Sequence, residues 1–119
     1  MKILGMMALV LVLLLVPTGR AAADGWVGGM SVARLNVGSG QSSFGTTSQP
    51  SDTCSYFGFY FRFDATTTDG KNMYATLLAA KLSGKTVAIW YTPSPSRGTN
   101  ETNGCAPGAI ATVYQVALE

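Results

Sequence analysis

The chain has 119 residues, with eight Lys or Arg, six Asp or Glu and no histidine. Lys2 and Arg20 fall in an N-terminal segment with the features of an export signal, so residues 24–119 carry no net charge. Proteins that bind nucleic acid or acidic membranes normally present a basic face, and this balance disfavours both classes. The lack of histidine excludes nucleophile systems of the Ser–His–Asp and Cys–His types.

Residues 1–23 have the three parts of a secretory signal. Lys2 supplies the positive start, residues 3–16 are apolar apart from Gly5, and Ala21 to Ala23 offer small residues for cleavage after Ala23. An uncleaved membrane anchor is the alternative, but the apolar run is shorter than the roughly 20 residues of a spanning helix. We therefore expect residues 24–119 to form a single secreted or periplasmic domain without membrane insertion.

Three strands are predicted in the first half of this domain. Residues 27–37 alternate in their later part, with Ala33, Leu35 and Val37 on one face and Val32, Arg34 and Asn36 on the other. Residues 41–48 form a weaker strand centred on Phe44, and residues 49–52 have the composition of a loop.

The third predicted strand, residues 56–63, shows the strongest pattern because apolar residues recur strictly at every second position. Four phenylalanines are expected to face the core: Phe57, Phe59, Phe61 and Phe63. Tyr56, Tyr60 and Arg62 would then point outward, and Gly58 predicts a bulge or sharp bend.

A helix is predicted over residues 70–82, capped by Thr68 or Asp69 and ended by Ser83-Gly84. Its apolar stripe consists of Met73, Tyr74, Leu77, Leu78, Ala80 and Leu82. A fourth strand follows over residues 86–92, with Val87, Ile89 and Tyr91 on one side and Trp90 on the other. After the polar loop 97–108, a fifth strand over residues 109–118 places on one face Ile110, Thr112, Tyr114, Val116 and Leu118.

Three strands, a helix and two more strands match the OB-fold order. We therefore predict a mainly β protein, a five-stranded OB-fold-like barrel (βββαββ). Cys54 and Cys105 are the two cysteines of a chain sent to an oxidising compartment, so we expect them to pair and to tie the third strand to the entry of the fifth. Two thiolates without histidine do not complete a tetrahedral shell, so no metal site is expected.

The run from Leu77 to Tyr91, in which a helix ends at Ser83-Gly84 and Val87-Ala88-Ile89-Trp90-Tyr91 follows, resembles a stretch of exported bacterial OB-fold proteins. The B subunits of subtilase cytotoxin and typhoid toxin have this arrangement, and their mature chains also begin near a Trp, as Gly25-Trp26 does here. The resemblance implies a secreted homopentamer that recognises cell-surface glycans. It assigns no glycan-binding residue in this sequence.

Candidate chemistry is sparse. Asp64 and Asp69 flank a loop and are interpreted as a turn residue and a helix cap, not as the paired carboxylates of a glycosidase. No phosphate-binding glycine motif occurs. We expect no enzyme activity, no catalytic residue and no cofactor.

The candidate ligand-binding residues are the outward side chains Tyr56, Tyr60, Arg62 and Trp90. Aromatic faces with a guanidinium suit sugar stacking and hydrogen bonding, but they suit an oligomer contact or packing under the helix or a loop equally well.

The leading prediction is a non-catalytic exported binding module, in its sharpest form a glycan-binding, ring-forming subunit like a toxin B component. The alternative is a secreted or periplasmic protein–protein interaction or inhibitor module that uses loop 93–108 as its contact surface. Single-stranded nucleic-acid binding is natural for OB folds but is disfavoured here by export and neutral charge.

Overall fold

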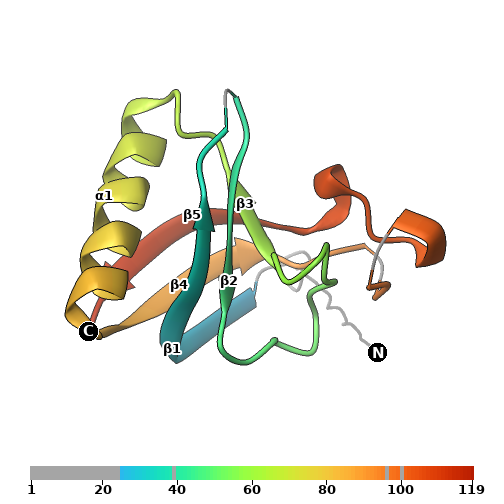
Figure 1. Cartoon of the computed structure of the whole chain (residues 1–119), viewed down its shortest axis with the longest axis horizontal. Coiled ribbons are helices and arrows are strands. Elements are labelled where there is room, and N and C mark those ends of the chain that lie inside the picture. Colours follow the sequence, from blue (N-terminus) through green and yellow to red (C-terminus); the bar gives the residue numbers. More distant parts are fainter. Residues whose placement is uncertain (1–24, 39, 96, 100) are drawn as a thin grey trace, which may run out of the picture.

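A computed structural model describes residues 25–119 except 39, 96 and 100, and the predicted signal lies outside these residues. The elements follow the predicted order of three strands, one helix and two strands (Figure 1). They are β1 (Gly25–Asn36), β2 (Ser42–Thr46), β3 (Phe61–Phe63), α1 (Thr68–Ser83), β4 (Thr86–Thr92) and β5 (Ala111–Leu118), with short 3-10 turns η2 (Glu101–Asn103) and η3 (Pro107–Ala109) before β5.

The five strands form one sheet that closes in a ring in the order β1-β2-β3-β5-β4. Strand β4 returns to β1, and every neighbouring pair is antiparallel except β3 and β5, which are parallel. Helix α1 packs against β1, β4 and β5, on the left in Figure 1. The predicted fold class, mainly β with an OB-fold-like strand order and a helix between the third and fourth strands, is confirmed.

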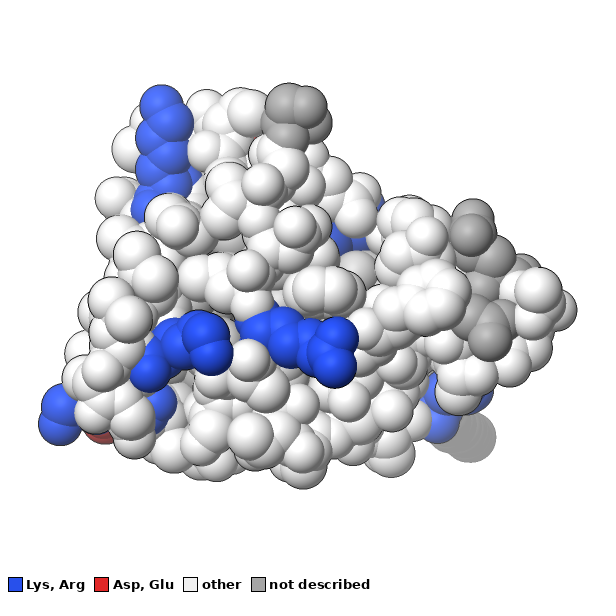
Figure 2. Space-filling view, in the orientation of Figure 1, with Lys and Arg blue, Asp and Glu red and all other residues white. Residues whose placement is uncertain are grey.

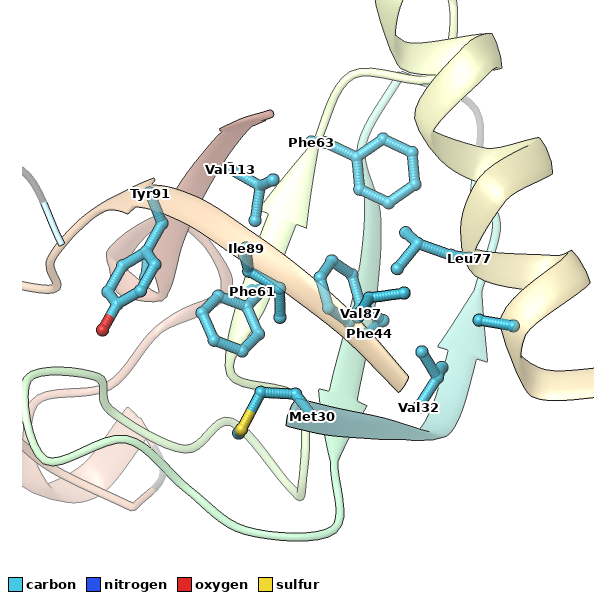
Figure 3. Close-up of a cluster of buried hydrophobic side chains, with 12 residues drawn as sticks. Met30, Val32, Phe44, Phe61, Phe63, Leu77, Val87, Ile89, Tyr91 and Val113 are labelled. Carbon is cyan, nitrogen blue, oxygen red and sulfur yellow. The ribbon is translucent and has the colours of Figure 1, made fainter. Parts of the chain in front are cut away.

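The inside of the ring is filled by aromatic and aliphatic side chains from all five strands and from α1 (Figure 3). The ring of Phe61 lies between Phe44, at 5.0 Å between centroids, and Tyr91, at 5.2 Å. Leu77 closes the core from the helix side and is fully buried. Burying side chains of this size contributes about 2 kcal/mol each, which makes this cluster the main source of stability.

Two bulges change which residues face the core. In β1 the register shifts between Val32 and Arg34, so Val32 and Leu35 both pack inward while Ala33 is exposed. In β5 the register shifts opposite Trp90 and Tyr91, so Val113 and Val116 pack inward while Tyr114 is exposed. The faces predicted for these two strands were therefore wrong, because an extra residue in one strand moves every later side chain to the opposite side.

The third strand is shorter than predicted. Phe61 and Phe63 are buried as expected, but Phe57 is 62% exposed and Phe59 packs outside the ring core. The chain bends at Phe57 and Gly58, both with positive φ, and Tyr56 pairs with Phe59 across this bend. The sharp bend predicted at Gly58 is confirmed, whereas the inward position predicted for Phe57 and Phe59 was wrong.

The helix begins two residues earlier than predicted. Its cap is Thr67, whose hydroxyl accepts the backbone N–H of Gly70 at 2.9 Å, and not Thr68 or Asp69. The left-handed Gly84 ends the helix as predicted. Leu82 was expected in the apolar stripe but is 78% exposed.

Residues 47–60 and 93–110, here called the bridged loops, leave the ring at one end and are joined by the predicted Cys54–Cys105 disulfide. The backbone N–H of Cys54 donates to the Ser94 hydroxyl at 3.0 Å, and that of Ser55 donates to the Gly98 carbonyl at 3.1 Å. Cys54, Cys105 and Ile110 form a second buried cluster, onto which Tyr56, Phe59 and Ala109 pack.

Candidate functional site

A row of polar side chains crosses the outer face of all five strands. The inward residues Leu35, Phe44, Phe61 and Ala111 are strand partners, so their neighbours along each strand point outward. These outward residues are also paired in register and form what we call the Arg62 row: Asn36, Ser43, Arg62, Thr112 and Thr92. Hydrogen-bonding groups from five separate strand positions are thereby aligned across the sheet: Asn36 and Thr92 are exposed, Arg62 and Thr112 are half-buried, and Ser43 is buried.

Arg62 stands at the centre of this row and is half-buried. Its Nε donates to the Ile110 carbonyl at 3.2 Å, which fixes the guanidinium over the junction of β3 and β5. Among the described residues, this is the one hydrogen bond recorded for the Arg62 side chain. This bond holds the two terminal guanidinium nitrogens in place, and no carboxylate of the described residues forms an ion pair with them.

A pocket of about 260 Å³ opens beside the row, between the turn after β1 and strands β3 and β5. Its walls are formed by Gly40, Gln41, Arg62, Phe63, Asp64 and Thr112. The Gln41 side chain donates to the Pro107 carbonyl at 3.1 Å and so connects the turn after β1 to the bridged loops. OB folds bind oligosaccharides and oligonucleotides on the face of strands 2 and 3 and on the loops after strands 1 and 4, and this pocket lies beside that face, at β3 and the turn after β1.

The pocket contains a carboxylate as well as a guanidinium. The Thr66 hydroxyl donates to Asp64 Oδ1 at 2.6 Å and the Thr66 backbone N–H at 2.9 Å, so the pKa of Asp64 lies below its ordinary value. Asp64 is therefore ionised at neutral pH. It acts as a turn residue, as predicted, and also supplies hydrogen-bond acceptors to the pocket.

The four predicted site residues do not converge. Arg62 lies in the row, but Tyr60 packs against the ring core and Tyr56 against the second cluster. Trp90 lies on the outside of β4, half-buried, with its ring 6.2 Å from that of its strand partner Trp26 in an edge-to-face arrangement.

Asn36, Ser43, Thr92 and Thr112 were absent from the predicted site because each is unremarkable within its own strand. Only the pairing register brings them beside Arg62. The one sequence signal that points to them is a polar residue placed opposite Arg62 in a trial pairing of the strands.

Within the part of the chain that the structure describes, no helix is long and apolar enough to cross a membrane. The same residues hold no group of three or more His, Cys, Asp or Glu side chains arranged for a metal ion. Comparison with protein-family models, with curated proteins and with solved structures finds no match for this chain. The resemblance to toxin B subunits therefore stays a prediction.

Proposed function

We propose that this protein is an exported, non-catalytic binding module that recognises a neutral, hydroxyl-rich ligand, such as a glycan, at the Arg62 row. The observation that carries the proposal is the alignment of five polar residues, of which Ser43 is buried and the other four are half-buried or exposed, beside a pocket that contains both Arg62 and Asp64. The Cys54–Cys105 disulfide supports an oxidising compartment.

The chemistry of the pocket favours a neutral glycan. A sugar hydroxyl both donates and accepts hydrogen bonds, so it can donate one to the Asp64 carboxylate while it accepts one from Arg62 or Thr112. An anionic ligand would be repelled by the ionised Asp64, which lines the same pocket as Arg62. Single-stranded nucleic acid is disfavoured for this reason, and because binding of that kind uses a basic groove with stacked aromatic rings.

A glycan array with matched variants tests the proposal. Asp64→Asn and Thr112→Val remove an acceptor and a hydroxyl from the pocket, and each should weaken glycan binding at least about tenfold. Thr76→Val is the control, because Thr76 lies on α1 beside a different pocket. Arg62→Lys should lose binding too, since an ammonium cannot reproduce the planar guanidinium.

Two results would reject the proposal. One is an array on which no glycan binds the purified residues 24–119. The other is binding that Asp64→Asn and Thr112→Val leave as strong as Thr76→Val does. Sizing of the same preparation tests the ring-forming, toxin-like version, which a strict monomer would eliminate.

The second candidate function is a protein–protein interaction or inhibitor module. The bridged loops favour it, because the Cys54–Cys105 disulfide and hydrogen bonds such as Ser94 N–H to the Asp52 carbonyl, at 3.0 Å, hold them as a fixed surface outside the ring. Such preorganisation reduces the entropy lost on binding a partner. Replacing loop 97–104 by a short glycine linker should abolish binding to a protein partner and leave glycan binding at the Arg62 row in place.

A further inference from the structure

The most exposed aromatic side chain of the bridged loops stands at the tip of a tight turn. Tyr56 and Phe59 pair with each other, with hydrogen bonds of 2.9 Å and 3.1 Å, and Phe57 and Gly58 form the bend between them. Phe57 has φ 53° and Gly58 has φ 89°, so both central residues are left-handed. A hairpin turn of this kind normally takes Asn followed by Gly.

Phenylalanine at the first of these positions is unfavourable for two reasons. A left-handed backbone costs a bulky residue free energy that Asn or Gly would avoid. Its ring is also 62% exposed, so it gains little from burial in return. Of the residues that the structure describes, Phe57 is the one non-glycine residue with positive φ. The Phe57 ring meets the Tyr56 ring edge to face, 4.8 Å between centroids, which offsets part of this cost, but the residue remains 62% exposed and so stays available to a partner.

Hydrogen bonds and close packing against β2 hold this turn in place. Arg34 Nη1 donates to the Phe57 carbonyl at 3.3 Å, and the Arg34 guanidinium lies 6.0 Å from the centre of the Phe59 ring. The Ser55 hydroxyl accepts the N–H of Gly58 at 3.1 Å. The turn also lies directly on β2, because a side chain added at Gly45 would overlap the Gly58 carbonyl. The Phe57 ring is therefore presented on a rigid support.

Positive charge lies beside this turn. Lys81 Nζ donates to the carbonyl of Ala33, which places Lys81 next to Arg34 on the outer side of β1. Figure 2 shows Lys and Arg side chains across the middle of this face, over β1 and α1, whereas Asp and Glu are visible only at its lower left edge. A partner for this face should therefore carry acidic groups.

We infer that Phe57 is the anchor of a protein–protein contact, and that it inserts into an apolar pocket with an acidic rim on a partner protein. Aromatic residues, phenylalanine among them, and arginine are enriched in protein–protein interfaces. The inference rests on the second candidate function and supplies its contact residue and partner class. It is independent of ligand binding at the Arg62 row.

The first test separates strain from contact by using two variants at one position. Phe57→Ala removes the ring but keeps a residue that disfavours positive φ, whereas Phe57→Asn removes the ring and fits the turn. Phe57→Asn should therefore melt a few degrees above Phe57→Ala. The claim that the aromatic residue is kept at a cost also requires Phe57→Asn to melt no lower than the wild type, so a Phe57→Asn variant that melts below the wild type would overturn it.

The second test identifies the contact by photo-crosslinking. Residues 24–119 with p-benzoylphenylalanine in place of Phe57 are irradiated with the exported proteins of the source organism, and the crosslinked product is sequenced. We expect the crosslinked product to contain one protein other than this chain, and its yield should fall as the salt concentration is raised. Excess wild-type protein and the control Leu82→Ala, which alters another exposed apolar residue, should compete for it. Phe57→Asn should compete at least about tenfold less well.

Three outcomes would overturn the inference: no crosslink, a crosslink only between two copies of this chain, or equal competition by Phe57→Asn and wild type. Loss of glycan binding in Asp64→Asn with an intact crosslink would show that the two surfaces work separately. A crosslink without any glycan binding would reject the proposal at the Arg62 row and leave this inference standing.

Discussion

The ring and the bridged loops each bury a cluster of side chains, but they differ in what holds them together. The ring core joins residues from five strands and α1, with Phe44, Phe61 and Tyr91 in contact at its centre. In the second cluster, three of the described residues are buried: Cys54, Cys105 and Ile110. The ring is thus stabilised by apolar burial, whereas the loops depend on a covalent bond and on hydrogen bonds between backbones. Rigidity outside a core can be obtained with little hydrophobic area, provided that the chain is crosslinked.

Removal of an aromatic ring from each region should give the largest contrast. Phe61→Ala opens a cavity between Phe44 and Tyr91 and should lower the free energy of unfolding by about 4 kcal/mol. Phe59→Ala, in the loop cluster, should cost markedly less because Phe59 is only partly buried. Urea denaturation measures both values. Similar losses for the two variants would mean that the regions form one core.

Loss of the disulfide should separate the two regions. The double variant Cys54→Ala/Cys105→Ala should lose about 3 kcal/mol, and the loss should concentrate in the bridged loops. In amide hydrogen exchange, the N–H groups of Ser55 and Ser94 should lose protection while those of Ile89 and Val113 keep most of theirs. Uniform loss of protection through the ring would contradict this division.

Tyr91 links the two regions, since its ring belongs to the core and its hydroxyl donates to Asp52 Oδ1 at 2.6 Å. Tyr91→Phe should cost about 1 kcal/mol at neutral pH. Burial, followed by the hydrogen bond to Asp52, raises the pKa of Tyr91 well above its ordinary value. Because the neutral form is the one favoured in the fold, this contribution is complete below about pH 10 and is lost as the pH rises further. Thermal melts above pH 10 should therefore show a steeper decline for the wild type than for Tyr91→Phe.

The smallest effect should come from a polar atom inside the ring. The Ser42 hydroxyl is fully buried, and no hydrogen-bond partner is recorded for it among the described residues. Ser42→Ala should raise the free energy of unfolding by about 0.5–1 kcal/mol, because an unsatisfied buried hydroxyl is unfavourable. A destabilised variant would show that the hydroxyl is hydrogen-bonded in solution.

The order of elements and the disulfide were predictable because they depend on local patterns: alternation, a helix ended by Ser83-Gly84, and two cysteines in a chain predicted to be exported. Side-chain direction was not predictable where a bulge intervenes, as at Arg34 and Tyr114, since a bulge arises from pairing with another strand. Phe57 and Phe59 kept perfect alternation in the sequence, and only the fold shows that the chain turns between them. Arg62 is the one member of the Arg62 row that the sequence predicted as a site residue. The other four members are brought together by the pairing register of the strands, which the sequence does not show.

The ring closes across a narrow seam. Strands β3 and β5 are paired only at Phe61 with Ala111 and at Arg62 with Thr112, fewer positions than at any other junction of the sheet. The Arg62 side chain donates to the Ile110 carbonyl beside this seam, so the residue that we propose binds a ligand also links β3 to the residue before β5. A ligand that drew Arg62 away from the Ile110 carbonyl would weaken the β3–β5 pairing, the shortest in the ring. Occupancy of the pocket would then change how readily the whole sheet opens.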